Sequence, residues 1–318
     1  MVGIERQIGA ALLVAAGLQA QLAPAPKGPM AYTRQPDMQN VSYGPHERHV
    51  FDLWKAKSDW PTPIVVYFHP GGFSHGDKSW IEWLDKPLLE LCLKRGISVA
   101  TANYRYCDRQ LHLPGPMYDG ARAIQFLRLH AKEWNLNPQA VAAAGGSSGA
   151  GISLWIGFHD DLADAASADP VQRQSTRISA IGSVDGQASY DPWVIAKLID
   201  EKILQSPIIP ALYGIKGDDM KTQQAHEAFA AGSPITYLKA DAPPTFLYYT
   251  QNVKPLPPAN QSEMIHNPRF GLLLKERMDK LGVECLFRTP KDYSSSEARP
   301  FTVEMADFFM KYFPSDKR

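Results

Sequence analysis

The sequence predicts an α/β fold, with a mostly parallel β-sheet covered by helices on both faces. Short apolar runs typical of buried strands alternate with longer segments of helical periodicity. A glycine-rich segment follows one of these runs, and a second run leads into a glycine-flanked serine. The chain has 318 residues, 44% of them hydrophobic, which is enough for one large domain core.

The predicted elements alternate along the chain. Residues 63–68 form an apolar run of β-branched and aromatic residues, and residues 97–106 are predicted to be a second buried strand. A long helix follows and stops at Asn137-Pro138, before another strand at residues 141–144. Strands separated by helices indicate βαβ units and a parallel sheet. The helix is marked by residues at helical spacing: Gly120, Ile124, Leu127, Ala131 and Trp134.

The segment Gly-Gly-Ser-Ser-Gly at residues 145–149 contains the pattern Gly-x-Ser-x-Gly. It follows the strand at 141–144 and precedes a helix-like segment, the layout of a nucleophile elbow. Ser147 is favoured over Ser148 because glycine occupies both of its flanking positions. The alternative is a phosphate-binding loop, but the Gly-Lys-Ser/Thr and Gly-x-Gly-x-x-Gly patterns are absent. The pattern therefore favours Ser147 as a catalytic nucleophile.

A second glycine motif, His-Pro-Gly-Gly-Phe, occupies residues 69–73. Glycines after a buried strand can turn backbone N–H groups toward an oxygen that becomes negatively charged during reaction. The alternative is an ordinary Pro-Gly turn.

Together these motifs resemble the α/β-hydrolase family, and within it the hormone-sensitive-lipase-like and carboxylesterase-like branch. The resemblance covers roughly residues 45–315. It implies Ser147 as the nucleophile of an esterase acting on a small-molecule ester. The N–H groups of Gly71, Gly72 and Ser148 would form the oxyanion hole. The matching segments are residues 69–73, similar to His-Gly-Gly-Gly; Asn103-Tyr104-Arg105 with Pro114 and Asp119; residues 145–149; and residues 242–247, similar to the strand before the triad acid.

The remaining triad members are missing from the positions where this fold carries them. A serine nucleophile needs a base, and the base needs an acid, in the chain order serine, acid, histidine. Residues 251–255, after the strand predicted at 245–250, contain no carboxylate. Asn252 is the nearest substitute, but it lacks a negative charge. No histidine follows the last predicted strand, at 283–288.

Two residues could replace the missing partners. His266 lies between the acid-bearing strand and the next helix, in a loop expected on the same side of the sheet as Ser147. Asp185 follows the strand after the elbow helix. The alternatives are a helix-flanking histidine and an ordinary Asp-Gly turn. His69 is expected to be structural, and His75 to be exposed near the glycine loop.

The predicted organisation is a signal peptide at residues 1–20, a linker at 21–44 and a hydrolase domain at 45–318. A helical cap insertion is expected at about 186–240. The apolar run at 8–18 is too short to span a bilayer comfortably, which favours a secreted or periplasmic protein over an uncleaved anchor or a surface helix.

Within the predicted cap, residues 193–204 and 220–231 are expected to be helical. Tyr190, Trp193 and Tyr213 are expected either to line a pocket or to pack the cap onto the core. Residues 300–313 are expected to form a terminal helix docked on the sheet.

Composition excludes several classes of function. Lysine plus arginine and aspartate plus glutamate both number 33, so nothing favours a nucleic-acid partner. No Cys/His spacing indicates a metal site, and no cofactor is expected. Cys92, Cys107 and Cys285 are expected to be reduced.

Three functional hypotheses remain. The first is a secreted serine hydrolase with a relocated base, and the second is an inactive scaffold that binds a ligand or partner. The third is a slow acyl-binding enzyme that relies on the oxyanion hole without a full triad.

Overall fold

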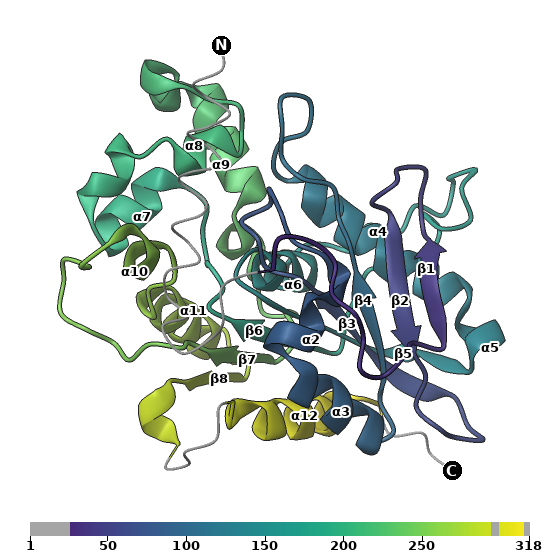
Figure 1. The fold of residues 1–318 in the computed structure, drawn as a ribbon. Coiled ribbons are helices and arrows are strands. Elements are labelled where there is room, and N and C mark those ends of the chain that lie inside the picture. The colour runs from purple at the N-terminus through teal and green to yellow at the C-terminus, as the bar shows by residue number, and fades with distance from the viewer. Residues whose placement is uncertain (1–25, 294–298, 315–318) are drawn as a thin grey trace.

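The computed structural model describes residues 26–293 and 299–314, which contain an eight-stranded sheet (Figure 1). The strand order is β1-β2-β4-β3-β5-β6-β7-β8. β1 and β2 pair antiparallel, and β2 pairs antiparallel with β4, whereas the pairs from β4 to β8 are all parallel. This mostly parallel sheet confirms the predicted α/β-hydrolase fold. The strands are β1 (Met38–Ser42), β2 (Val50–Trp54), β3 (Thr62–Phe68), β4 (Ser98–Ala102), β5 (Leu136–Gly146), β6 (Ala180–Val184), β7 (Thr245–Tyr248) and β8 (Cys285–Arg288).

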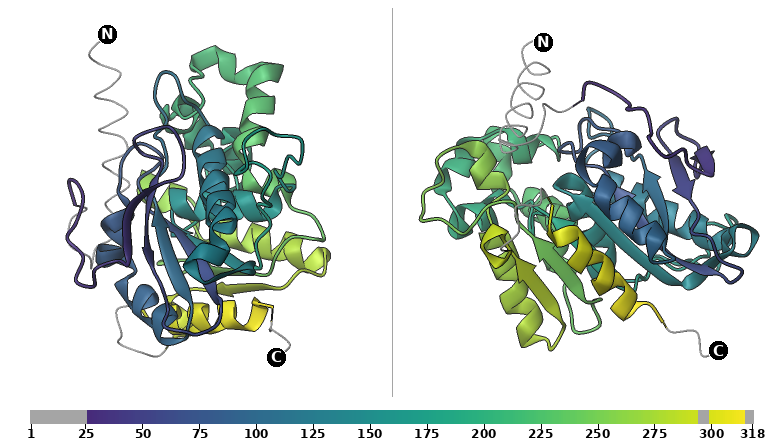
Figure 2. Two further views of the ribbon diagram at one scale, coloured as in Figure 1. Left: turned by 90° about the vertical axis from the view of Figure 1, so that its right-hand side faces the viewer. Right: turned by 60° about the horizontal axis from the view of Figure 1, so that its bottom comes forward.

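Helices cover both faces of the sheet (Figure 2). The α-helices outside the β6–β7 connection are α2 (Ile81–Leu84), α3 (Lys86–Lys94), α4 (Gly115–Leu129), α5 (Ala131–Trp134), α6 (Ser148–Phe158), α10 (Gln261–Ile265), α11 (Arg269–Lys280) and α12 (Phe301–Tyr312). The short 3-10 helices outside that connection are η2 (Lys78–Trp80) and η6 (Pro290–Asp292).

Alternation along the central strands divides the core into two layers. Ile64, Val66 and Phe68 of β3 belong to the core cluster that includes residues of α4, α6 and α11, whereas Val65 and Tyr67 belong to the cluster that includes residues of α3 and α12. Successive strand residues point to opposite faces, so a strand covered on both sides is apolar throughout. This explains the uninterrupted apolar run in the sequence.

The β6–β7 connection contains the helices of the predicted cap, at the upper left in Figure 1. Its two ends are joined, because the N–H groups of Ile235 and Tyr190 donate to the Ala188 carbonyl and the Ser233 hydroxyl, respectively. The elements are α7 (Pro192–Leu198), η3 (Glu201–Gln205), α8 (Ile208–Ala211), η4 (Gly217–Lys221), α9 (Gln223–Gly232) and η5 (Pro234–Tyr237).

Several predicted boundaries are wrong. The strand predicted at 97–106 ends at Ala102, and the helix predicted at 193–204 is two elements. It breaks because the Asp200 side chain accepts from Lys202 N and begins a separate 3-10 turn. The predicted helix through Trp134 is likewise divided, at His130.

The folded domain begins earlier than the boundary predicted at residue 45. β1 lies within the expected linker, and the buried hydroxyl of Tyr32 donates to Asp52. β1 is an edge strand whose residues are exposed or only partly buried, so it lacks the continuous apolar run that marks a strand buried on both faces. The predicted signal peptide, residues 1–20, lies outside the described residues.

Other predictions are confirmed. Residues 301–312 form the terminal helix α12, whose buried side packs against the sheet. Cys92, Cys107 and Cys285 are free thiols, and Cys92 and Cys285 are buried. Within the described part of the chain, no helix is long and apolar enough to cross a membrane.

Candidate active site

Ser147 occupies the turn between β5 and α6, with φ 48° and ψ −115°. Non-glycine residues rarely adopt such strained positive φ values, which are characteristic of functional turns. Gly149 makes the turn possible, since a Cβ there would lie 2.0 Å from the Phe68 carbonyl oxygen. A Cβ at Gly145 would lie 2.6 Å from the same oxygen. The flanking glycines therefore allow β3, β5 and α6 to approach closely around the serine.

His266 ends α10 and brings an imidazole to the serine. Its Nε2 lies 2.9 Å from Ser147 Oγ, within hydrogen-bonding distance. Burial lowers the pKa of His266, while the Asp185 charge and a hydrogen bond with the Ser262 backbone oppose that shift. The ring is therefore neutral at pH 7 and able to accept the serine proton.

Asp185 follows β6 with φ 52°. Its Oδ1 accepts from Thr250 N at 2.9 Å and its Oδ2 accepts from Thr250 Oγ1 at 2.8 Å. Burial raises the pKa of Asp185, and the opposing effects come from the His266 charge, Thr250 and the Arg299 charge. Across the described residues, no hydrogen bond links Asp185 directly to His266, so the coupling between them is electrostatic.

Gln187 joins the two segments that carry these groups. Its amide nitrogen donates to the carbonyl oxygens of Asp185, at 3.2 Å, and Ile265, at 2.7 Å. The Tyr190 hydroxyl donates to Gln187 Oε1 at 3.0 Å. This buried amide thus holds the Asp185 turn against the end of α10.

Both residues lie one strand earlier than the positions where the resembled family is expected to carry an acid and a base. Asp185 follows β6 instead of β7, and His266 follows β7 instead of β8. The chain order serine, acid, histidine is retained. The carboxyl ends of neighbouring parallel strands share one edge of the sheet, so a shift of one strand keeps the side chains within reach of Ser147.

The glycine loop begins where β3 ends. Gly71 has φ 136° and Gly72 φ 57°, and a Cβ at Gly71 would lie 1.9 Å from the His75 carbonyl oxygen. Side chains are therefore excluded from the tightest part of this loop. Phe73, with φ 60°, is buried and packs against the Tyr190 ring at 5.3 Å.

Tyr104 connects the glycine loop with the serine turn. Its hydroxyl donates to the His69 carbonyl at 2.8 Å and lies 3.0 Å from Ser148 Oγ. The two segments that carry Gly71, Gly72 and Ser148 are therefore held together.

The two histidines of this region differ in environment. His69 stacks on Tyr104 at 4.3 Å, and burial lowers its pKa to about 3, so it packs as a neutral ring, as expected. The expectation that His75 is exposed is wrong. His75 is partly buried, beside Ser74 Oγ and 5.8 Å from the Trp80 ring, because the loop folds back on η2.

The predicted aromatic residues of the cap are mostly buried. Tyr190 and Tyr213 lie in the main core cluster, and Trp193 packs against it. The Tyr190 ring fills the space above Gly151, where a Cβ would lie 2.0 Å from its hydroxyl. These aromatic side chains therefore pack the cap onto the core.

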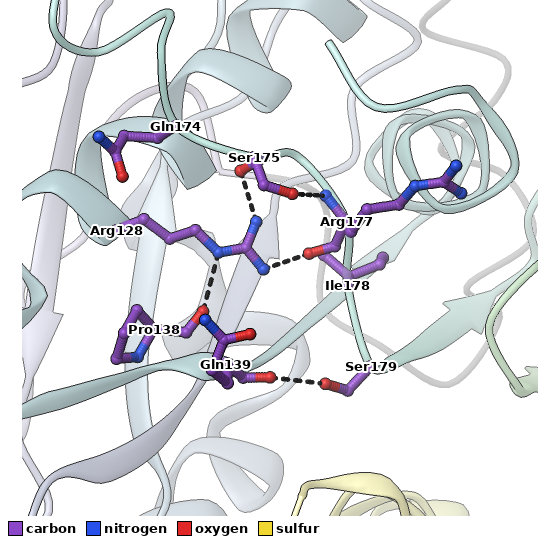
Figure 3. A pocket seen from close by; sticks show the side chains of 8 residues that line it. All are labelled: Arg128, Pro138, Gln139, Gln174, Ser175, Arg177, Ile178 and Ser179. Atoms are coloured by element: carbon purple, nitrogen blue, oxygen red, sulfur yellow. Dashed lines mark hydrogen bonds between the residues drawn. The ribbon is translucent and has the colours of Figure 1, made fainter. Parts of the chain in front are cut away.

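A separate cavity of about 390 Å³ lies at the amino ends of β5 and β6 (Figure 3). Ser147 and Asp185 follow the carboxyl ends of the same strands, so this cavity is not part of the candidate active site. Arg128 Nε donates to Pro138 O at 2.9 Å, and its terminal nitrogens donate to the carbonyls of Ser175 and Arg177. All these acceptors are backbone carbonyls, which indicates a structural arginine that ties α4 to the strands.

Among residues 26–293 and 299–314, no three His, Cys, Asp or Glu side chains cluster as metal ligands would.

Thr250 and Gln187 were not predicted from the sequence, since neither belongs to a motif. Tyr104 could have been found, because it lies in the Asn-Tyr-Arg segment that matches the resembled family.

Comparison with known proteins identifies the family. The BD-FAE family model matches residues 51–268, a span that contains the glycine loop, Ser147, Asp185 and His266. The chain belongs to the BD-FAE family. This α/β-hydrolase assignment agrees with the fold and with the resemblance seen in the sequence.

Curated relatives carry esterase names. The chain is 25% identical over 222 residues to the probable carboxylic ester hydrolase LipM of Mycobacterium tuberculosis, covering 67% of this chain and 47% of that protein. It is 24% identical over 229 residues to the esterase LipQ of the same organism, covering 70% and 50%. The chain thus spans about half the length of these curated relatives.

Solved structures share the fold. A truncated carbohydrate esterase from gut microbiota aligns with a TM-score of 0.66 at 18% identity, covering 90% of this chain and 99% of that chain. The esterase Est2 of Thermogutta terrifontis, in its propionate-bound form, aligns with a TM-score of 0.61 at 20% identity, covering 88% and 97%.

Proposed function

We propose that this protein is a serine hydrolase that cleaves a small carboxylic ester, with Ser147 as nucleophile, His266 as general base and Asp185 as the acid. The observation that carries the proposal is the 2.9 Å contact between Ser147 Oγ and a neutral His266 Nε2 at a strained turn. Family membership and the esterase names of the relatives support the same reaction class.

The reaction proceeds by acyl transfer. Ser147 Oγ bonds to the ester carbonyl carbon while its proton passes to His266 Nε2. The backbone N–H groups of Gly71, Gly72 and Ser148 donate hydrogen bonds to the carbonyl oxygen and stabilise the negative charge that develops on it. The ester C–O bond then breaks, and His266 returns the proton to the leaving alcohol. In the second half of the reaction, His266 takes a proton from a water molecule whose oxygen attacks the acyl-serine carbonyl. The bond to Ser147 Oγ then breaks, the proton returns to that oxygen, and the carboxylic acid leaves.

Asp185 contributes its negative charge. That charge opposes the effect of burial on His266 and therefore favours the imidazolium that forms when the serine proton is taken up. A carboxylate in this position replaces the acid that the sequence lacks after β7.

A fluorophosphonate probe tests the proposal, because it reacts with an activated serine without requiring the natural substrate. We expect the folded protein to be labelled and the Ser147→Ala variant to remain unlabelled. Heat-denatured protein serves as a second control, since an unfolded chain has no activated serine. Absence of labelling in the folded wild-type protein would instead favour an inactive scaffold that binds a ligand or partner.

We also propose that residues 1–20 direct export and are removed near Ala20, supported by the uncharged apolar run at 8–18. Intact-mass measurement of protein recovered from the periplasm or medium tests this. A mature chain that retains Met1 would contradict cleavage.

A further inference from the structure

Thr250 directs both of its donors at one carboxylate. Its backbone N–H and its hydroxyl bond to different oxygens of Asp185, at 2.9 and 2.8 Å. Thr250 lies just beyond β7, and Asp185 N donates to the Tyr248 carbonyl at 2.8 Å across the same strand pair. The sheet register therefore sets these residues side by side.

In a typical triad the carboxylate of the acid accepts a hydrogen bond from the histidine ring, and that bond links the two groups. No hydrogen bond fixes Asp185 to His266 within the described residues, and Asp185 sits in a strained turn with φ 52°. Something else must determine where the carboxylate points. Two hydrogen bonds to separate oxygens fix both the position and the rotation of a carboxylate.

We propose that Thr250 is the positioning residue of this site, holding the Asp185 carboxylate ionised and oriented toward His266. This role rests on the proposed hydrolase function. It also explains how the triad tolerates its shift by one strand: the end of β7 supplies donors for the acid where the resembled family carries the acid itself.

Other charged and titratable groups also act on Asp185. Arg299 contributes a positive charge, but its guanidinium is bonded to Asp85 at 2.7 and 3.0 Å. The groups whose charges interact with Asp185 are His266 after α10, Arg299 before α12, and Tyr248 and Tyr249 at the end of β7.

The decisive variant is Thr250→Val, which keeps the side-chain shape and the backbone N–H but removes the hydroxyl donor. Thr250→Ser restores a hydroxyl and is the rescue variant. The matched control is Thr245→Val at the other end of β7, where the lost hydroxyl bonds to the Pro243 carbonyl. Circular dichroism and thermal unfolding establish that each variant is folded.

Two measurements are made on these variants. The first is ester hydrolysis as a function of pH, with kcat and KM separated. The second is the titration of the Asp185 carboxyl carbon by NMR, which does not depend on activity.

We expect Thr250→Val to lower kcat by about 10-fold, with KM nearly unchanged, because a hydrogen bond to a charged group is lost. The pKa of Asp185 rises in this variant, since the ionised form loses a donor, whereas the acid limb of kcat/KM, which reports the protonation of His266, does not move to higher pH. In Asp185→Asn that limb moves to lower pH, because His266 loses the charge that raises its pKa. Thr250→Ser and Thr245→Val retain the wild-type profile.

The outcomes separate this role from the proposed function. An unchanged Asp185 titration in Thr250→Val overturns the positioning role, whatever the activity. If the titration shifts but the wild-type protein neither hydrolyses esters nor reacts with the fluorophosphonate probe, the proposed function fails while the effect of Thr250 on the carboxylate stands.

Discussion

At the residue scale, the proposed reactivity of Ser147 depends on a residue that is its neighbour in space and not in sequence. His266 lies 119 positions further along the chain, yet its Nε2 is 2.9 Å from the serine oxygen. Its burial keeps the ring neutral, which a base requires, while the nearby carboxylate stabilises the ring once it has gained a proton. Burial and the Asp185 charge thus have opposite effects on the pKa of His266, and in the proposed mechanism they act before and after the proton transfer, respectively.

His266→Ala is expected to lower kcat/KM for ester hydrolysis by roughly 1,000-fold or more, because the serine loses its base. In the wild-type protein, kcat/KM should fall at low pH with a midpoint below 6.5, since burial lowers the pKa of His266 and protonation removes its acceptor. A pH–rate profile checks the midpoint. His226→Ala, which changes an exposed histidine of α9, is the matched control. Full activity in His266→Ala would exclude His266 as the base.

At the scale of elements, the site exists because β3, β5 and α6 meet without side chains between them. A Cβ at Gly149 would lie within 2.0 Å of Phe68 O and 2.8 Å of His69 O. At Gly146 the same atom would meet only the Pro70 ring, at 3.8 Å, an ordinary contact. Two glycines of one motif therefore have different structural requirements.

Gly149→Ala is expected to destabilise the protein by about 3 kcal/mol or more, because backbone atoms of β3 must move. Gly146→Ala is expected to change the free energy of unfolding by less than about 1 kcal/mol. Urea unfolding of the two variants provides the comparison. Equal stabilities would show that close packing at Gly149 does not limit the fold.

At the scale of the whole molecule, buried ion pairs tie distant segments to the sheet. Asp119 of α4 accepts from Arg105 Nη2 at 2.6 Å, and His49 Nε2 lies 3.1 Å from the same carboxylate. Although burial alone raises the pKa of Asp119, the nearby His49 side chain and the hydrogen bonds from Arg105 outweigh it and lower that pKa. The ionised carboxylate therefore stabilises the folded state.

Asp119→Asn is expected to cost about 3 kcal/mol of unfolding free energy at pH 7, since it removes one partner of a buried pair. The pKa of Asp119 is lower in the folded state than in the unfolded state. Its charge therefore adds to the free energy of unfolding at pH values above the unfolded-state pKa, and this stabilisation is lost as the pH falls through the folded-state pKa. The difference between wild type and variant should therefore shrink below about pH 4. Urea unfolding at pH 7 and pH 3 measures it, with the exposed Glu276→Gln as control. A difference independent of pH would contradict this assignment of the charge.

The sequence by itself determined the architecture and the serine turn. Buried strands, helical periodicity and glycines that admit no Cβ are local properties, so β3, β5, α6 and the position of Ser147 could be predicted from neighbouring residues. The short edge strand β1 and the break at Asp200 could not, because pairing across the sheet and a single side-chain cap decide them.

Only the tertiary structure decided which groups reach the serine. Asp185 and His266 were candidates among several, since sequence spacing says little about distance across a sheet. Their juxtaposition depends on strand order, on Gln187 bridging two loops and on Thr250 bonding to the acid. These contacts join residues up to 78 positions apart through hydrogen bonds that leave no local pattern. Folding the parallel sheet brings the strand ends to one edge, and that is what places Asp185 and His266 beside Ser147.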